Sequence, residues 1–290
     1  HLRRSWLFVG AADKEAILSS NNSDADVCIQ EFEDFCVPEL RREARLMMPD
    51  VLSDWRARQI VATVRINPLE DPDGLKDLDA AMHAGADAIL VPKANTKEQI
   101  LLLQKHINDL EKQYGRIVGG TAIIPNIEQA RGLVNVVDVL SASPQIVGAL
   151  VASEDMAVSL NAPRQQNSEI LNHVRNMFHI ACRSVRITAI DMPYTFTDDD
   201  GVRQQARLAR NIGMVAKSTV NANHCAIINE ILTPGKREVE IAADVVAVFE
   251  KARDSGAGQM VYKGTKIEVP TYLNAKQVIE RYQALMTFEK

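Results

Sequence analysis

Eight short apolar runs, separated by longer amphipathic stretches, dominate this chain of 290 residues. The runs are mostly β-branched and alternate poorly, which is typical of parallel strands that are buried on both faces. Because eight strands alternate with helices and no Gly-x-Gly-x-x-Gly turn occurs, the pattern predicts a (β/α)8 TIM barrel, an α/β fold, rather than a dinucleotide-binding fold. The runs are Trp6–Val9, Val27–Phe32, Ile60–Ile66, Ala86–Val91, Thr121–Ile124, Ile146–Val151, Ile187–Ile190 and Met214–Val220.

Helix signals occupy the stretches between these predicted strands. Pro72, in a first turn, and Gly85, at the end of an apolar stripe, predict a helix between them. Thr96-Lys97-Glu98-Gln99 is a capping box, and the helix that it opens should end near Gly115. We expect Asn126 to cap the helix after the fifth strand.

The C-terminal part of the chain is longer than a barrel needs. We expect residues 1–235 to form the catalytic barrel domain. Residues 236–290 hold two helical patterns, Glu238–Arg253 and Asn274–Met286, joined by the Gly-rich stretch Gly256–Pro270. One of these helices should complete the barrel, and the rest should form a helical appendage that covers a barrel mouth or reaches a neighbouring subunit.

Charge and composition exclude some classes of function. The chain has 33 Lys and Arg against 38 Asp and Glu, and a net charge of −5 argues against a dedicated nucleic-acid-binding protein. No apolar run reaches the roughly 18 residues of a membrane-spanning helix, and the first run breaks at Gly10, unlike a signal peptide. The four cysteines lack zinc-ligand spacing. We therefore expect a cytoplasmic enzyme without membrane or nucleic-acid partners.

Polar and charged side chains follow six consecutive predicted strands. In a barrel of this type, the carboxyl ends of the strands carry the chemistry. Carboxylates that crowd on one rim repel each other unless a cation joins them. The segments are Glu31–Asp34, Arg65–Asn67, Lys93, Asn126–Glu128, Ser153–Asp155 and Asp191.

Glu128 and Asp155 end neighbouring strands, so they are candidates for ligands of one metal ion. Oxygen ligands without His or Cys favour Mg²⁺, or Mn²⁺ in its place, and Mg²⁺ typically takes one or two carboxylates besides waters and substrate oxygens. Glu33 and Asp34 are candidates to hold those waters. Arg65 either pairs with a rim carboxylate or binds the carboxylate of an anionic substrate, and we favour the substrate.

Structural explanations compete with these assignments. Asp155 is also a candidate helix N-cap, and Glu128 is also a first-turn carboxylate that the helix dipole favours. Lys93 is a candidate Schiff-base nucleophile, although the acidic rim favours an ion pair. The remaining alternatives are salt bridges of Glu33 or Asp34 with Arg41 or Arg45.

Several short segments form a recognisable pattern through their order and spacing. They are Arg4–Val9, Glu33-Asp34, Val64–Pro68, Gly85–Lys93, Ile127-Glu128, Glu154-Asp155 and Asp191–Tyr194. Over nearly the full length, this pattern resembles the citrate lyase beta subunit-like branch of the HpcH/HpaI aldolase superfamily. No single segment is specific, but their succession is.

The resemblance implies a Mg²⁺-dependent carbon–carbon lyase or condensing enzyme, commonly a homotrimer. Such enzymes split a 3-hydroxyacyl-CoA-type thioester, such as malyl- or citryl-CoA, into an acyl-CoA and a 2-oxo-acid. In the family, the residues that match Glu128 and Asp155 ligate the metal, and the residue that matches Arg65 grips the oxo-acid.

The resemblance also implies roles outside the metal site. The residues that match Glu33 and Asp34 organise the metal's waters. A C-terminal carboxylate from a neighbouring subunit serves in acid–base chemistry, and that place falls here on Glu268. Arg41, where the family often has Lys, is a candidate contact for a CoA phosphate, although a solvated helix face explains it equally well.

The chain departs from the family pattern mainly on the thioester side. Gly10-Ala11 stands where the family has Pro-Gly, Glu31 stands for an Asp, and Asn221-Ala222 replaces His-Pro. Glu268 is one methylene longer than the usual Asp, and a displacement of about 1 Å can cost large rate factors. A metal-bound oxo-acid is therefore better supported than any particular acyl carrier.

Three alternatives to the lyase stay open. Water could intercept the thioester at the same site, which would give a hydrolase. A class II pyruvate-type aldolase without CoA would share the metal and Arg65 but usually has a His near the metal. His83, His106, His173 and His179 do not stand at strand ends and His224 lies just past the eighth strand, so the aldolase has less support than the lyase. A non-catalytic homologue that binds metal and oxo-acid is the third.

Overall fold

The computed structural model describes residues 2–163, 165, 168–254 and 261–288. The chain divides into two compact units, Arg3–Glu230 and Ile231–Lys290. The division falls close to residue 235, where the sequence analysis placed the end of the barrel domain.

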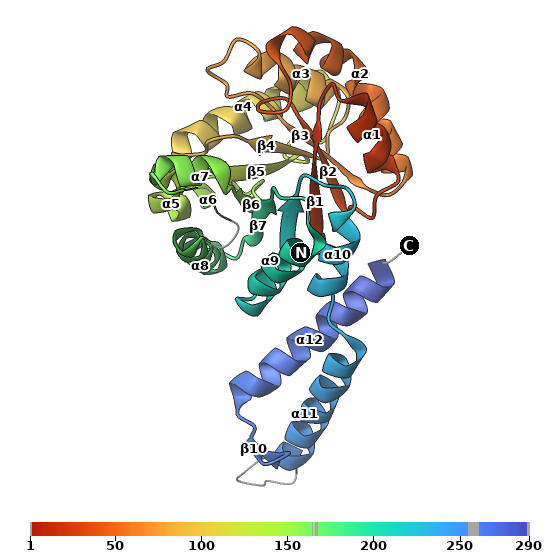
Figure 1. Ribbon diagram of the computed structural model, residues 1–290, viewed down its shortest axis with the longest axis vertical. Helices are drawn as coiled ribbons and strands as arrows, with labels where there is room; N and C mark the ends of the chain where they lie inside the picture. Colours follow the sequence, from red (N-terminus) through yellow and green to blue (C-terminus); the bar gives the residue numbers. More distant parts are fainter. Residues whose placement is uncertain (1, 164, 166–167, 255–260, 289–290) are drawn as a thin grey trace. The chain divides into compact units, whose positions relative to one another are not determined.

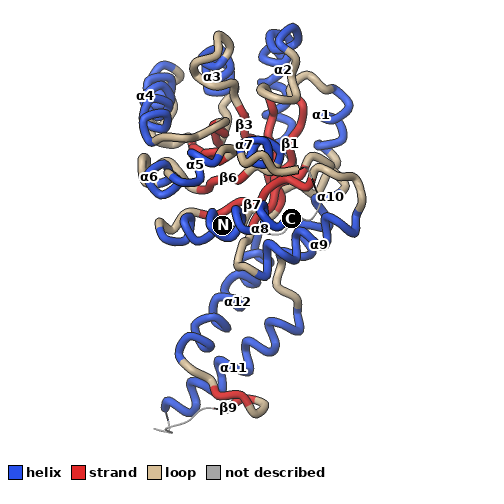
Figure 2. The backbone as a smooth tube through the Cα atoms, turned by 60° about the vertical axis from the view of Figure 1, so that its left-hand side comes forward, coloured by secondary structure: helices blue, strands red, loops and turns tan. Residues whose placement is uncertain are grey.

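The first unit is a closed barrel of eight parallel strands in sequential order, with helices around it (Figures 1 and 2). Each strand overlaps one predicted apolar run, so the predicted (β/α)8 fold is confirmed. The strands are β1 (Ser5–Gly10), β2 (Val27–Glu31), β3 (Val61–Arg65), β4 (Ala88–Val91), β5 (Ala122–Ile127), β6 (Gly148–Val151), β7 (Thr188–Tyr194) and β8 (Ala216–Thr219).

Alternate residues of each strand face the barrel interior, where one apolar cluster is buried. The cluster contains Trp6, Phe8, Val27, Ile29, Ala88, Leu90, Ile124, Leu150, Ile190 and Ala216. Because side chains alternate with a period of two, Asn126 follows Ile124 on the inward face of β5. The barrel interior is thus apolar along most of the strands and becomes polar toward their carboxyl ends.

Helices follow the strands and bury their apolar faces against the barrel. The capping box at Thr96 and Gln99 is present at the start of α4, as predicted. The helices are α1 (Lys14–Asn21), α2 (Pro38–Ala57), α3 (Gly74–His83), α4 (Lys97–Gln113), α5 (Ala130–Val134), α6 (Val136–Leu140), α7 (Glu154–Ser159), α8 (Glu169–Ser184), α9 (Asp199–Asn211) and α10 (His224–Leu232).

Two predictions about helices are wrong. Asn126 does not cap α5, because β5 continues to Ile127 in register with β6 and the N-cap is Gln129. The helix that follows β8 is α10, and neither of the two later helices takes its place. The apolar run at the start of α10 was too short to be recognised as a helix by periodicity alone.

The second unit is a pair of helices, α11 (Lys236–Asp254) and α12 (Val269–Phe288), which lie side by side (Figure 2). A short antiparallel pair, β9 (Val261–Tyr262) and β10 (Thr265–Lys266), lies between them in sequence. Phe249 stacks on Tyr272 with ring centroids 4.4 Å apart. This small core holds α11 and α12 together.

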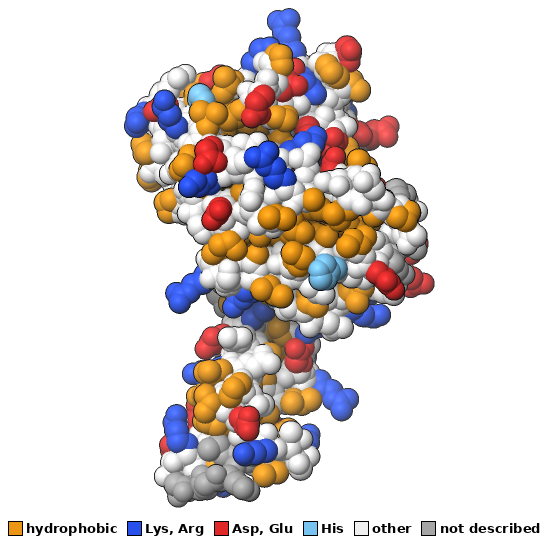
Figure 3. Space-filling view, turned by 90° about the vertical axis from the view of Figure 1, so that its left-hand side faces the viewer, with side chains coloured by type: hydrophobic (Ala, Val, Ile, Leu, Met, Phe, Trp, Pro, Cys, Tyr) orange, Lys and Arg blue, Asp and Glu red, His pale blue; other side chains and the backbone are white. Residues whose placement is uncertain are grey.

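The face of the first unit that carries α4 to α8 has apolar side chains gathered on it (Figure 3). Exposed apolar residues of these helices include Val134, Val158 and Ile180. Within the described part of the chain, no helix has the length and apolar character to cross a membrane.

Candidate active site

Four carboxylates surround the guanidinium of Arg65 at the carboxyl end of β3. Arg65 donates hydrogen bonds to Glu33 and, over 2.8 Å, to Glu128 Oε1. It is also ion-paired with Asp34 at 3.2 Å and with Glu31 at 3.7 Å. The predicted residues Arg65, Glu33, Asp34 and Glu128 therefore meet on one rim, as expected from parallel strands whose carboxyl ends lie together.

Burial and charge set the protonation of this cluster. Burial alone would lower the pKa of Arg65, but the carboxylates of Glu128, Glu31 and Glu33 raise it, so the guanidinium stays charged. Burial raises the pKa of Glu128 to about 8 against the opposing effect of Arg65, with further increases from Glu33 and Asp155. Burial and mutual repulsion therefore make it costly for all these carboxylates to be ionised around Arg65 alone, and a second cation would stabilise the ionised forms.

Glu31, which the sequence marks only as a charged strand end and as a departure from the family's Asp, has a defined role in the structure. Its buried carboxylate accepts hydrogen bonds from the backbone N–H groups of Glu33, Asp34 and Phe35, at 2.8, 3.0 and 2.6 Å. Burial raises its pKa to about 6, although Arg65 opposes that shift. Glu31 thereby fixes the turn that presents Glu33 and Asp34. The sequence signal for this role is an acidic side chain at the end of a strand, followed by two to four loop residues whose backbone N–H groups need acceptors.

Glu128 and Asp155 fit a divalent cation. Oε1 of Glu128 accepts from Arg65 and Asn126, whereas its buried Oε2 has no hydrogen-bond partner. Asp155, in the first turn of α7, lines the adjoining cavity and is close enough to raise the pKa of Glu128. No group of three His, Cys, Asp or Glu side chains among the described residues could hold a metal alone. This donor set suits Mg²⁺, which completes its shell with waters and ligand oxygens.

The helix-capping alternatives for these two residues are wrong. The N-cap of α7 is Ser153, so Asp155 does not occupy that position. Glu128 precedes Gln129, the N-cap of α5, and therefore lies outside the first turn. Each carboxylate is left available for another role.

Lys93 forms an ion pair rather than standing free as a nucleophile. Its Nζ lies 2.5 Å from Glu33 Oε1. Burial alone would lower the pKa of Lys93, but the hydrogen bond and charge of Glu33 raise it, which keeps the amine protonated. A protonated amine does not attack a carbonyl, so the ion-pair alternative is favoured over the Schiff base.

A cavity of about 350 Å³ opens beside this cluster. Arg65, Asn126 and Asp155 line its polar side. Its apolar side includes Phe8, Phe35, Leu150, Val158 and Val220. The volume and the mixed lining suit a small anionic ligand that also carries an apolar group.

Two predicted site residues pair with residues other than those of the cluster. Arg41 is ion-paired with Asp73 at 3.3 Å and with Asp71 at 3.5 Å, near the start of α3. Glu268 belongs to the second unit, where its side chain is 65% exposed and lies 3.7 Å from Lys266. The first unit alone therefore does not contain every residue that the resemblance implies.

Arg41 and Arg45 of α2 form salt bridges with residues other than Glu33 and Asp34. Arg45 pairs with the buried Asp77 at 2.7 Å, and Arg41 with the aspartates before α3. Glu33 and Asp34 pair with Arg65 instead. The competing interpretation of these two carboxylates as surface salt-bridge partners of α2 is therefore wrong.

Asp191 faces the helical layer, away from the central cavity. Because Ile190 points into the barrel, Asp191 points outward, where it accepts from Arg175 at 2.5 Å and from Lys217 at 2.7 Å. Lys217 also donates to the backbone oxygen of Met192. Burial would raise the pKa of Asp191, but the charges of Arg175 and Lys217 lower it, so the carboxylate stays ionised. Burial lowers the pKa of Lys217, and the charge of Asp191 opposes that shift.

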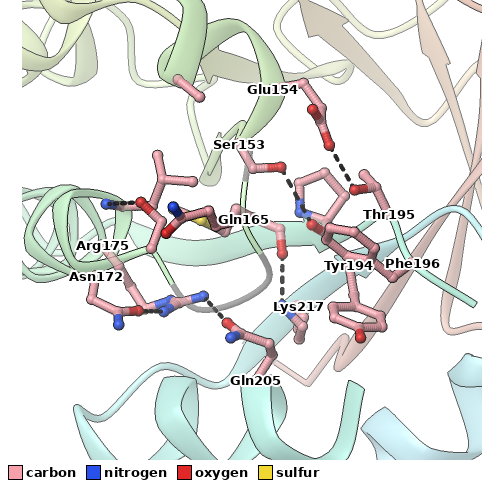
Figure 4. A pocket seen from close by; sticks show the side chains of 15 residues that line it. Ser153, Glu154, Gln165, Asn172, Arg175, Tyr194, Thr195, Phe196, Gln205 and Lys217 are labelled. Atoms are coloured by element: carbon pink, nitrogen blue, oxygen red, sulfur yellow. Dashed lines mark hydrogen bonds between the residues drawn. The ribbon is translucent and has the colours of Figure 1, made fainter. Parts of the chain in front are cut away.

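Arg175 and Lys217, which are both ion-paired with Asp191, line a second, smaller pocket (Figure 4). In the close-up, Arg175 and Gln205 are linked by a hydrogen bond, and Lys217 lies near them. Ser153 lines this pocket and also the larger cavity. The ion pairs of Asp191 thus hold Arg175 and Lys217 in the lining of this second pocket.

A (β/α)8 barrel with a buried arginine among carboxylates at the carboxyl ends of its strands, and one carboxylate oxygen left without a partner, has the features of an enzyme site that accepts a divalent cation. Residues 4–222 match the model of the HpcH/HpaI aldolase/citrate lyase family. The chain belongs to this family.

Individual relatives agree with this assignment. The citrate lyase subunit beta of Leuconostoc mesenteroides subsp. cremoris is 29% identical over 282 residues, which cover 96% of this chain and 93% of the relative. The L-malyl-CoA/beta-methylmalyl-CoA lyase of Cereibacter sphaeroides (strain ATCC 17025 / ATH 2.4.3) is 28% identical over 286 residues, covering 91% and 89%.

A solved structure shares the fold. The protein CitE from Mycobacterium tuberculosis, in complex with magnesium, acetoacetate and coenzyme A, superimposes with a TM-score of 0.79 at 22% identity. The match covers 97% of this chain and 98% of that protein. It supports the (β/α)8 architecture.

Proposed function

We propose that this chain is a Mg²⁺-dependent lyase that cleaves a 3-hydroxyacyl-CoA-type thioester into an acyl-CoA and a 2-oxo-acid, or condenses them in reverse. The observation that carries the proposal is the carboxylate of Glu128, which is held by Arg65 through one oxygen and buried without a partner at the other. The CoA thioester is suggested by the relatives that act on malyl-CoA.

Arg65 binds the oxo-acid half of the substrate. Its guanidinium is held in place by Glu33 and Glu128 and also lines the cavity, so it presents a preorganised positive charge to a substrate carboxylate. Glu128 and Asp155 hold the cation, and Glu33 and Asp34 orient its waters. When bound, Mg²⁺ acts as a Lewis acid on the oxygen atoms of the oxo-acid fragment.

Bond cleavage needs a base and a place for the electrons. Loss of the proton from the 3-hydroxyl turns that carbon into the carbonyl of the oxo-acid, while the electrons of the broken carbon–carbon bond form the thioester enolate. A carboxylate must then return a proton to that enolate. We assign this acid–base role to Glu268 of a neighbouring subunit in a homotrimer. Hydrolysis of the thioester at the same site is the close variant.

The proposal is tested by mixing the protein with Mg²⁺, glyoxylate, pyruvate or oxaloacetate, and acetyl- or propionyl-CoA. We expect a hydroxyacyl-CoA, or free CoA if hydrolysis follows, in the wild type. The Arg65→Gln variant should lose this product, whereas Arg56→Gln, an arginine that binds the carbonyl of Gly85 away from the rim, should keep it. Turnover of pyruvate with aldehydes and without CoA would instead establish the aldolase. Binding of oxo-acid and Mg²⁺ without turnover would establish the non-catalytic homologue.

A further inference from the structure

Asn126 is the last inward-facing residue of β5 before Glu128. Its side chain is 1% exposed, and it lines the cavity beside Arg65 and Asp155. In register it lies opposite Leu150 of β6, which is apolar. A polar side chain at this depth needs partners, because burial of an unpaired amide is costly.

The two ends of the Asn126 amide have different surroundings. Nδ2 donates to Glu128 Oε1, the same oxygen that accepts from Arg65. The amino group is the only donor of an amide, and Oε1 of Glu128 accepts from it as well as from Arg65, so the amino group lies on the side of Glu128. The amide oxygen Oδ1 therefore lies on the other side, where it is buried and has no hydrogen-bond partner.

Asn126 Oδ1 and Glu128 Oε2 are thus two buried oxygens without a hydrogen-bond partner, and their side chains are hydrogen-bonded to each other. Once Glu128 is deprotonated, as ligation of a cation requires, both atoms are acceptors and neither can satisfy the other. A divalent cation ligated by Oε2 would bring waters whose O–H groups are donors. Such a water is the group that Oδ1 lacks.

We propose that Asn126 is a positioning residue of the metal site, a role that rests on the site assigned in the proposed function. Its Nδ2 holds Glu128 so that Oε2 faces the cation, and its Oδ1 accepts a hydrogen bond from a water bound to that cation. Partners of metal ligands in this position typically change metal affinity by about 10- to 100-fold when removed.

Gln145 provides a matched control. It is also a buried amide, its Nε2 donates to the backbone oxygen of Thr121 at 2.9 Å, and its Oε1 has no partner. It precedes β6 and so lies at the amino ends of the strands, opposite to the cavity. Replacing it removes the same chemical groups without touching the proposed metal site.

The test is a calorimetric titration of the full-length protein with MgCl₂, without substrate, for the wild type, Asn126→Leu, Asn126→Ala and Gln145→Leu. Melting temperatures of the metal-free proteins establish that each variant folds, and the alanine variant serves if the leucine variant does not. We expect Mg²⁺ to bind Asn126→Leu about 10- to 100-fold more weakly than the wild type, and Gln145→Leu to bind within about twofold.

Mg²⁺ affinity within about twofold of the wild type in both Asn126 variants would overturn the inference, even if the oxo-acid bound less well. In that case Oδ1 would serve the substrate and not the metal's water. A wild-type protein that does not bind Mg²⁺ at all would overturn the metal site itself, and with it the proposed function. The two failures are therefore distinguishable.

Discussion

Arg65 at the end of β3 and Glu128 beyond β5 are joined by a hydrogen bond of 2.8 Å from Nη2 to Oε1, although β4 lies between their strands. Both side chains are buried. A buried guanidinium that already has a carboxylate partner is rigid, and Glu128 is left with one oxygen for another cation. This pair therefore fixes the positions of the central cation and of the carboxylate proposed to bind the metal.

Replacing Arg65 by Gln should lower kcat by about 100- to 1000-fold, the range found when one preorganised donor to a developing charge is removed. It should also destabilise the metal-free protein by about 3 kcal/mol or more, because buried carboxylates lose their cation. Turnover and urea unfolding of the variant test both effects. An active variant of unchanged stability would show that Arg65 is not the central cation.

Replacing Asp155 by Ala should abolish the increase in melting temperature that Mg²⁺ produces. The carboxylate is one of the two proposed protein ligands, and the stabilisation by a bound ligand grows with the logarithm of its concentration over its dissociation constant, so it vanishes when the affinity is lost. The control is Asp138→Ala, an exposed carboxylate in α6. If the Mg²⁺-induced shift persists in Asp155→Ala, Asp155 is not a ligand.

Much of this site follows from the sequence, since parallel strands of a barrel end on one rim and residues after their ends must converge. Arg65, Glu33 and Glu128 were found that way. The sequence did not reveal whether Asp191 points into the barrel or toward the helices, because both faces of a buried parallel strand are apolar. The role of Asn126 was also hidden, because a helix cap and a strand residue look alike when a strand end is misplaced by a few residues.

Lys217 and Asp191 form an ion pair in which both side chains are at most 1% exposed. Replacing Lys217 by Met leaves the carboxylate with Arg175 alone and the carbonyl of Met192 without its donor. We expect the free energy of unfolding to fall by about 3 kcal/mol, which is typical of a broken buried pair. Lys14→Met, which breaks an exposed pair with Glu43, should cost less than about 1 kcal/mol. Equal effects in denaturant unfolding would contradict the structural role of the buried pair.

The pKa of Glu128 makes both stability and Mg²⁺ binding depend on pH. Its ordinary value of 4.5 is raised to about 8 in the folded protein, mainly by burial. Between these values the folded state binds more protons than the unfolded state, so the metal-free protein should lose stability as the pH rises toward 8. Mg²⁺ must displace that proton, so the Mg²⁺-induced shift in melting temperature should shrink as the pH falls below about 8. A shift that is constant from pH 6 to 9 would contradict this assignment.

Glu268 is proposed to act in the site of a neighbouring subunit, and mixing two inactive variants tests this directly. Glu268→Gln and Arg65→Gln should each be inactive alone. If each site takes Arg65 from one subunit and Glu268 from another, a re-assembled 1:1 mixture has both native residues in roughly a quarter of its sites. Activity should then return to about that fraction of the wild type. Light scattering establishes whether the protein is a trimer, and Lys266→Gln controls for a change in this hairpin. An inactive mixture of correctly assembled trimers would mean that Glu268 does not complete a neighbour's site.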